Sequence, residues 1–317
     1  MPKISSERHV ERRLRFRDLQ VFLAVVQHGS MGKAAAQLGM TQPSVSELIS
    51  GLETTIGARL FDRSPQGVAP TLYGQALRKR AIASVDELKQ GLRDLEYLAN
   101  PTVGEVRIGC PDSIASTILS KMITGFCREY PRISLRFDQV PAPTLEVPAL
   151  QARKLDIVIS WLSTPKAEFG DELSVETLFD DEVVVAAGRS SHWARKRKIS
   201  LSDLTEGPWT GTPPETMARI VLDDAFRAAS LPTPQMEVTT FSVPLRQQLL
   251  TTAGFLTAMP KSLLRRSPEL KGLPITLPSH RYPVAVVTVK NRSLSPVVDL
   301  FLERVRQFIA SGDKGVS

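Results

Sequence analysis

Residues 34–53, AAAQLGMTQPSVSELISGLE, are the segment that most restricts how this chain can fold. Stretches with helical spacing lie on both sides of Gly39, which can adopt the positive φ that a tight turn between helices requires. Pro43 fits a helix only in the first turn, where its missing N–H has no intrahelical partner. The segment therefore predicts a helix ending at Leu38, a tight turn, and a second helix starting at Thr41.

The flanking residues complete a three-helix unit with a wing. Apolar residues from Phe16 to His28 recur at helical spacing, and Gly29 ends that helix. Ser30 is a suitable N-cap for the helix through Leu38. After Gly57, the sequence RLFDRSPQGVAPT contains two short extended pieces around a Ser-Pro-Gln-Gly turn, which predicts a small β-hairpin.

Polar side chains at the start of the third helix indicate a function. In a helix-turn-helix, the second helix of the motif presents its N-terminal side chains to the DNA major groove. Four short polar residues stand where base edges and phosphates would be met: Gln42, Ser44, Ser46 and Ser50. An ordinary helical hairpin with a solvated face is the alternative, and the wing with Arg63 favours DNA binding.

A long helical stretch is predicted from about Leu72 to Ala99. Its apolar residues alternate spacings of four and three, as in the seam of a two-stranded coiled coil: Ala81, Val85, Leu88, Leu92, Leu95 and Ala99. A buried helix within one chain is the alternative to a dimerisation helix. Because DNA half-sites related by a two-fold axis require a two-fold protein, the dimer is favoured.

The remaining chain has the texture of an α/β fold. After residue 103, helical segments alternate with β-rich runs: EVRIGC, ISLRFDQV, LDIVIS, EVVVAAG, EVTTF, FLTAM and YPVAVVTV. This alternation predicts parallel sheets covered by helices, arranged as two lobes with a cleft between them. We expect a first lobe at about 103–180 and 281–317, and a second at about 181–280.

Composition narrows the class of protein. The 317 residues exceed one usual core, and the net charge of +7 favours a polyanionic partner. No apolar run could span a bilayer, and the charged N-terminus does not resemble a secretory signal, so a cytoplasmic location is expected. Residues 1–15 are expected to be a flexible basic tail, 16–71 the DNA-binding domain, 72–102 the dimerisation helix and linker, and 103–317 the ligand-binding domain.

Metal, cofactor and catalytic sites are not expected. The histidines show no metal-ligand spacing: His9, His28, His192 and His280. No nucleophile elbow, P-loop or dinucleotide fingerprint appears. Cys110 lies beside the presumed cleft, but the predicted helix after it places Cys127 more than about 20 Å away. We therefore expect Cys110 to be an unreactive buried thiol rather than half of a redox-sensing pair.

Residues from about Phe16 to Leu98 resemble the DNA-binding part of a LysR-type transcriptional regulator. The resemblance rests on FLAVVQHGSMGKAAAQLGMTQPSVSELISGLETTIGARLFDR, with its LE...G..LF.R run, and on Thr71 after the wing. It extends more loosely over the rest of the chain. It implies a winged helix-turn-helix, a long dimerisation helix, and a two-lobed α/β effector-binding domain of the periplasmic-binding-protein type.

The resemblance also implies DNA-binding residues. Gln42, Pro43, Ser44 and Ser46 would approach the major groove, Thr41 would cap the helix, and Arg63 would meet a phosphate or the minor groove. Lys33 and Arg59 are expected near phosphates, with solvated charges as the alternative. Many members carry basic residues in place of Glu47 and Gln66; Glu47 could accept from a cytosine amino group or pair locally. The expected set is Lys33, Thr41, Gln42, Pro43, Ser44, Ser46, Glu47, Ser50, Arg59, Arg63, Gln66 and Thr71.

Effector-binding residues follow from the rule that ligands sit beyond the carboxyl ends of strands in open α/β sheets. The candidates are Ser113, Thr144, Trp161, Thr210, Thr212, Ser242 and Thr257. Nearly all are neutral hydrogen-bonding groups. They could hold a small carboxylate without a buried arginine, and a neutral ligand would fit the site equally well. For each position the alternative is a helix cap without ligand contact.

The sequence as a whole indicates a bacterial transcriptional regulator controlled by a small-molecule effector, with no enzymatic activity. Its expected partners are double-stranded DNA, the effector (a carboxylate or a sugar) and copies of itself as a homodimer or homotetramer; RNA polymerase is compatible with this function, and no membrane partner is expected. Segments such as PWTGTPPETMARIVLDDAF resemble regulators of sugar uptake or aromatic-acid breakdown. The alternative is an enzyme or small-molecule-binding module whose N-terminal helices only oligomerise.

Overall fold

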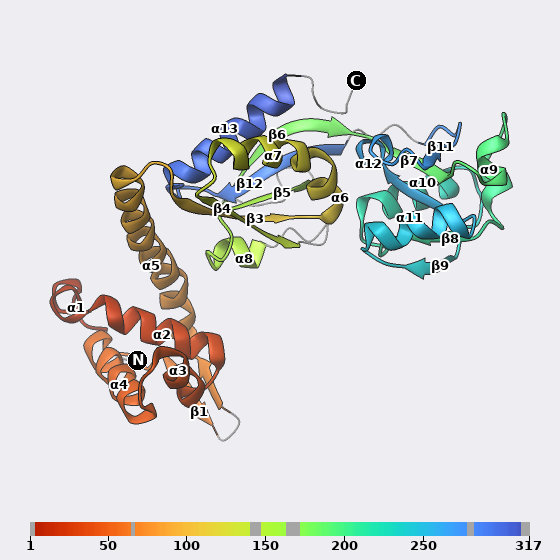
Figure 1. The fold of residues 1–317 in the computed structure, drawn as a ribbon. Helices are drawn as coiled ribbons and strands as arrows, with labels where there is room; N and C mark the ends of the chain where they lie inside the picture. The colour runs from red at the N-terminus through yellow and green to blue at the C-terminus, as the bar shows by residue number, and fades with distance from the viewer. Residues whose placement is uncertain (1–3, 65–66, 140–146, 163–171, 278–281, 312–317) are drawn as a thin grey trace. The chain divides into compact units, whose positions relative to one another are not determined.

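The chain divides into two units, residues 1–93 and 94–317. The computed structural model describes residues 4–64, 67–139, 147–162, 172–277 and 282–311 (Figure 1). An N-terminal helix-turn-helix unit is followed by an α/β unit with two five-stranded sheets, which confirms the predicted fold class.

The first unit contains the predicted helices and wing. Its elements are α2 (Phe16–His28), α3 (Met31–Leu38), α4 (Gln42–Ile56), β1 (Phe61–Ser64), β2 (Gly67–Pro70) and most of α5 (Leu72–Ala99), whose last turn belongs to the second unit. Gly39 ends α3 in the left-handed conformation at φ 63°, and the Thr41 hydroxyl accepts a hydrogen bond from the Ser44 N–H at the start of α4. Ala34 on α3 and Val45 on α4 are fully buried in the same hydrophobic core.

The prediction of a flexible tail over residues 1–15 does not hold for its second half. Helix α1 occupies Glu7–Arg13. The Ser5 N–H donates to the Ile56 carbonyl oxygen at the end of α4 (2.9 Å), and Leu14 packs against the core of the unit. These tertiary contacts fix a segment whose charged composition alone indicates disorder.

Helix α5 has the predicted bounds, but its apolar seam is divided. Ala81 and Val85 are buried in the core of their own unit, so they are not free to meet a partner helix. Leu88, Leu92 and Leu95 continue the seam with side chains that are 48%, 56% and 63% exposed. The exposed part of the seam is therefore shorter than the sequence predicted.

Two mixed sheets form the second unit (Figure 1). The first lobe contains the sheet β4-β3-β5-β12-β6, and the second lobe contains the sheet β11-β7-β10-β8-β9. The strands are β3 (Gly104–Cys110), β4 (Ile133–Gln139), β5 (Ile157–Trp161), β6 (Leu173–Asp181), β7 (Val183–Gly188), β8 (Trp209–Gly211), β9 (Met236–Thr239), β10 (Leu256–Pro260), β11 (Leu270–Gly272) and β12 (Tyr282–Val289).

The expectation of parallel sheets was wrong for part of each sheet. Strand β3 is parallel to β4 and β5, and β8 is parallel to β9 and β10. Strand β12 is antiparallel to β5 and β6, and β7 is antiparallel to β10 and β11. The chain leaves the first lobe after β6 and returns as β12, and this return strand runs against its neighbours.

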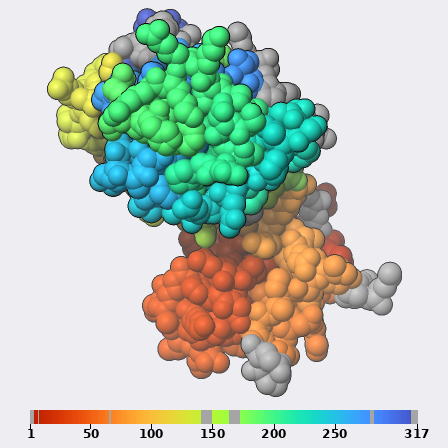
Figure 2. Space-filling model, turned by 90° about the vertical axis from the view of Figure 1, so that its right-hand side faces the viewer, coloured from red at the N-terminus to blue at the C-terminus, as the bar shows by residue number. Residues whose placement is uncertain are grey.

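Helices cover the sheets of both lobes. In the first lobe they are α6 (Asp112–Ile114), a π-helical turn (Ala115–Leu119), α7 (Ser120–Glu129), α8 (Val147–Gln151) and α13 (Pro296–Ala310). In the second they are α9 (His192–Arg195), a 3₁₀ turn (Leu201–Leu204), α10 (Met217–Ala228), α11 (Val243–Thr252) and α12 (Lys261–Arg265). Figure 2 shows the second lobe as one continuous body, coloured from green to light blue.

Two features are absent from the described residues. None of their helices combines the length and apolar character needed to cross a bilayer. No group of three or more His, Cys, Asp or Glu side chains in the same part of the chain is placed to hold a metal ion.

Candidate functional site

The start of α4 is exposed to solvent. Thr41, Gln42 and Pro43 are exposed, whereas Val45 and Ile49 on the opposite face are fully buried. The Thr41 Oγ1 lies 2.8 Å from the Ser44 Oγ and accepts from the Ser44 N–H at 3.3 Å. The cap therefore fixes the backbone, while the polar side chains of the first turn project from the surface.

The wing places Arg63 against the same helix. Its guanidinium donates to the hydroxyl oxygens of Ser46 and Ser50, each at 3.4 Å. Its Nη2 also lies 3.8 Å from Glu53 Oε2. The structure thus brings three of the predicted residues together on one polar surface formed by α4 and β1.

Glu53 is an organising residue of this surface that the sequence analysis missed. Its Oε1 accepts hydrogen bonds from the backbone N–H groups of Leu60 (2.7 Å) and Phe61 (3.2 Å). These bonds join the last turns of α4 to the beginning of the wing. A carboxylate one turn after Ser50, on the same helix face, was the signal available in the sequence.

The other predicted DNA-binding residues have different positions. Lys33, Glu47 and Arg59 are exposed. The Thr71 hydroxyl donates to the Arg59 carbonyl oxygen (2.7 Å) and accepts from the Gly74 N–H (3.1 Å), so it is occupied in capping α5. Gln66 lies outside the described residues.

A cavity lies between the two lobes of the second unit, with about 520 Å³ of empty space that includes open solvent. It gathers residues from the carboxyl ends of strands in both lobes. The first lobe contributes Pro111, Asp112, Ser113, Gln139 and Trp161. The second lobe contributes Thr212, Thr216, Met217, Phe241, Arg246 and Pro260.

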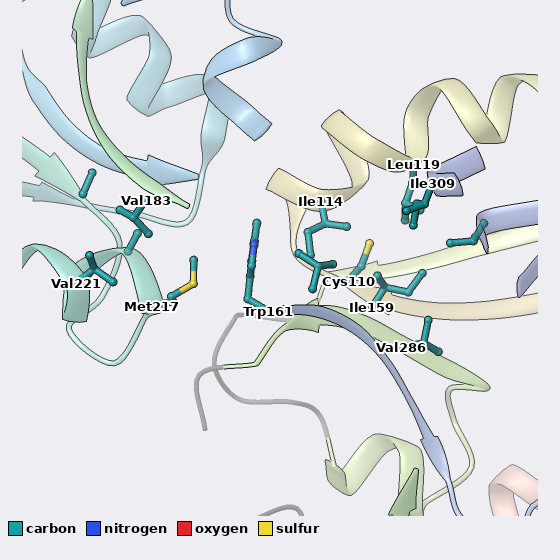
Figure 3. Packing of buried hydrophobic residues seen from close by; sticks show 14 of the residues in the cluster. Cys110, Ile114, Leu119, Ile159, Trp161, Val183, Met217, Val221, Val286 and Ile309 are labelled. Carbon is teal, nitrogen blue, oxygen red and sulfur yellow. The ribbon is translucent and has the colours of Figure 1, made fainter. Parts of the chain in front are cut away.

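Three of the predicted effector-binding residues line this cavity: Ser113, Trp161 and Thr212. Trp161, the last residue of β5, extends into the space between the lobes, with Met217 on one side and Ile114 on the other (Figure 3). Thr212 shares a hydrogen bond with Thr216, whose hydroxyl reaches the Pro213 carbonyl oxygen. The strand-end rule therefore located the cavity.

The structure places the other predicted effector residues elsewhere. Thr210 and Thr257 are fully buried inside strands β8 and β10 and bond to the carbonyl oxygens of Val238 and Ala258. Ser242 is exposed and caps α11 by accepting from the Leu245 N–H. None of the three is among the residues that line the cavity. Thr144 lies outside the described residues.

Arg246 is a charged residue of the cavity lining that the sequence analysis missed, since its candidates were nearly all neutral. It lies on α11 and is 5% exposed. Its Nε is buried without a hydrogen-bond partner among the described residues. Burial lowers the pKa of Arg246 to about 10, and the charge of Asp112 opposes that shift. Arg246 lies between Val243 and Leu250 on the buried face of α11, a position that only the folded chain shows.

The two cysteines are both free, and Cys110 is buried whereas Cys127 is exposed. Burial, together with the charge of Asp112, raises the pKa of the Cys110 thiol to about 12. At pH 8 its thiolate fraction is therefore on the order of 10⁻⁴.

Iodoacetamide at pH 8 is accordingly expected to alkylate Cys127 and to leave Cys110 unmodified in the folded protein. The readout is mass spectrometry of tryptic peptides, and the same reaction in 6 M urea, roughly the strength that unfolds small domains, is the control in which both cysteines react. Equal alkylation of the two cysteines in the folded protein would contradict the assignment of Cys110 as an unreactive thiol.

Comparisons with known proteins agree with this architecture. Residues 16–75 match the model of the bacterial regulatory helix-turn-helix protein of the lysR family, and residues 99–310 match the LysR substrate binding domain. The HTH-type transcriptional regulator TdcA of Escherichia coli K12 is 29% identical over 301 residues, covering 92% of both chains. YdcI of the same organism, an uncharacterized HTH-type transcriptional regulator, is 27% identical over 298 residues, covering 93% of this chain and 96% of the relative.

Solved structures share the fold. CbnR, a LysR family transcriptional regulator, is similar with a TM-score of 0.61 and 19% identity, covering 93% of this chain and 99% of CbnR. A full-length OxyR variant from Pseudomonas aeruginosa gives a TM-score of 0.64 at 19% identity, with 94% and 95% covered. The matched family models span both units, and the chain therefore belongs to the LysR family of DNA-binding transcriptional regulators with an effector-binding domain.

Proposed function

We propose that the start of α4 enters the DNA major groove and reads base edges there. The observation that carries this proposal is the exposure of Thr41, Gln42 and Pro43, with Ser44 partly exposed beside them, on a helix whose other face is fixed in the core. Arg63 in the wing contacts the phosphate backbone or the minor groove beside this helix. Lys33 and Arg59 add backbone contacts, because exposed cations near the docked face release counterions from DNA.

The proposed DNA-binding form is a dimer joined through residues 72–99, with two dimers in a tetramer. Support comes from the exposed leucines on α5, since an unpaired apolar seam with this spacing is typical of a two-stranded coiled coil. Two α4 helices related by a two-fold axis would then meet the two halves of one operator. RNA polymerase is a compatible further contact of such a regulator.

The cavity between the lobes is the proposed effector site. A ligand there would bind one arrangement of the lobes more tightly than another, and a preference of a few kcal/mol is enough to shift the population. The change would alter the spacing of the DNA-reading heads. No catalytic step is assigned to this cavity.

For the target genes, the sequence resemblance favours sugar uptake or aromatic-acid breakdown. The buried Arg246 and the aromatic side chains of Trp161 and Phe241 support an acid rather than a sugar as the effector. A regulator of such bacterial genes would act in the cytoplasm, where the DNA is.

A salt series with the full-length protein and a random-sequence duplex tests the DNA-binding proposal. The logarithm of the affinity is expected to fall linearly with the logarithm of salt concentration, by about 0.9 per neutralised phosphate. Arg63→Ala is expected to reduce the slope by about one, because one phosphate contact is lost. Arg227→Ala, in the exposed Arg227–Asp224 pair of the second unit, is the matched control with an unchanged slope. Affinity that does not respond to salt would support the alternative that the N-terminal helices only oligomerise.

A further inference from the structure

We propose that the cavity between the lobes binds a small zwitterion, an α-amino acid with an apolar side chain. This inference rests on the proposal that the cavity is the effector site, and it adds the chemical class of the ligand. It depends on three residues of the cavity lining whose polar side-chain groups have no partner among the described residues, and on the apolar side chains of the lining.

The first group is the Arg246 guanidinium. The side chain lines the cavity, is 5% exposed, and makes no hydrogen bond or ion pair with any described residue. Burying a cation without a partner is unfavourable in free energy, so a ligand that pairs with the guanidinium would gain binding free energy. A carboxylate matches the planar guanidinium and can accept two parallel hydrogen bonds from it.

The second group is the indole N–H of Trp161. The side chain is 4% exposed, and its Nε1 is buried with no hydrogen-bond partner in the described part of the chain. Trp161 belongs to the first lobe and Arg246 to the second. Because a carboxylate has about four acceptor sites, one carboxylate can accept hydrogen bonds from donors of both lobes.

The third group is the Asp112 carboxylate, which gives the cavity an acceptor with a negative charge. It lines the cavity, is half-buried, and forms no hydrogen bond or ion pair through its side chain with the described residues. Its charge acts on Arg246, but the two side chains are not joined in an ion pair. A simple carboxylate ligand would pair with Arg246 and be repelled by Asp112. A ligand with both groups can pair its carboxylate with Arg246 and its ammonium group with Asp112.

The remaining lining is largely apolar. Phe241, Met217 and Pro260 from the second lobe also line the cavity, together with Trp161 from the first lobe. These surfaces fit an aliphatic or aromatic side chain better than a polar one.

The test uses the full-length protein, titrated calorimetrically with each of the twenty standard amino acids. Two matched sets of analogues then separate the charges: L-phenylalanine with 3-phenylpropanoate and 2-phenylethylamine, and L-leucine with 4-methylpentanoate and 3-methylbutylamine. At least one apolar amino acid is expected to bind, with a Kd about tenfold or more below the Kd of either of its analogues that lacks one charge.

Variants assign the charges to residues. Asp112→Asn is expected to remove the tenfold advantage of the amino acid over the analogue without an amino group. Arg246→Met places an apolar side chain on the buried face of α11. It is expected to abolish binding of the amino acid and of its analogue without an amino group. Ser242→Ala, outside the lining, is the control with unchanged binding. Tryptophan fluorescence in urea verifies that each variant is folded, because all three tryptophans lie in the second unit.

Two results would overturn the inference. One is that none of the twenty amino acids binds. The other is that an analogue without an amino group binds at least as tightly as the matching amino acid, and that this analogue binds Asp112→Asn more tightly than it binds the unmodified protein. The second result would leave the cavity as the effector site and replace the zwitterion with a simple acid. The salt-dependent DNA binding is measured separately, so failure of the DNA-binding proposal would be recognised on its own.

Discussion

Replacing Asp156 with Ala is expected to lower the free energy of unfolding of the second unit by about 3–5 kcal/mol. Asp156 is buried and joins two arginines: Arg107 Nη2 lies 2.7 Å and Arg292 Nη2 lies 2.9 Å from its Oδ1. The Arg292 side chain is fully buried. Without the carboxylate, this buried guanidinium would lose its ion pair with Asp156.

The measurement for this prediction is urea unfolding followed by tryptophan fluorescence, which reports on the second unit alone. Trp161, Trp193 and Trp209 are the three tryptophans of the chain. Asp224→Ala is the matched control, since it breaks the exposed pair with Arg227, and exposed pairs contribute about 0–1 kcal/mol. An unfolding midpoint for Asp156→Ala equal to that of the control would show that the buried cluster does not stabilise the unit.

The same cluster gives the second unit a pH dependence. Burial alone would raise the pKa of Asp156, but the hydrogen bonds and charge of Arg107 and the charge of Arg292 outweigh burial and lower it. Its stabilising contribution is therefore fully present above the unfolded-state pKa of about 3.9 and is lost as the pH falls through the lower pKa of the folded state. Asp156→Ala should lack this loss when urea midpoints are measured from pH 7 downwards.

Ser44→Ala is expected to weaken binding to a selected DNA site by about 1–3 kcal/mol, about ten- to one-hundredfold, and to leave binding to random duplexes unchanged. The hydroxyl lies in the first turn of α4, beside Gln42, and a contact with a base edge carries sequence information that a phosphate contact does not. The helix itself remains fixed, because Val45 stays in the core.

Fluorescence anisotropy with labelled duplexes of both kinds measures this difference. Thr54→Ala is the control on the same helix, since its hydroxyl bonds to the Ser50 carbonyl oxygen in the last turns of α4. Equal loss of affinity for both duplexes would reassign Ser44 to the phosphate backbone.

Local sequence signals predicted the first unit well. Gly39 readily adopts the positive φ that ends α3, whereas Pro43 restricts the backbone and is tolerated in the first turn of α4. Their spacing positions the turn and the second helix without knowledge of the rest of the chain. The exposure of Gln42 follows from that spacing. By contrast, the role of Glu53 depends on backbone groups of Leu60 and Phe61, which only the folded wing brings within reach.

The cavity shows where sequence reasoning ends. Residues following strands were good candidates when the strand end was correct, as for Ser113 and Trp161. Thr210 and Thr257 are not among the lining residues, because they lie within strands whose ends are at Gly211 and Pro260. Arg246 escaped notice because a charged residue on an amphipathic helix is usually solvated, and only the tertiary structure shows which face of α11 is buried.

The account depends most on the claim that the exposed start of α4 meets base edges in DNA. Selection of duplexes from a random-sequence library, with the full-length protein and with Gln42→Ala, measures this most directly. We predict that the full-length protein enriches a sequence with two related half-sites and that Gln42→Ala relaxes the preference at one base pair in each half-site. Enrichment of no sequence, or of the same sequence by both proteins, would contradict the account.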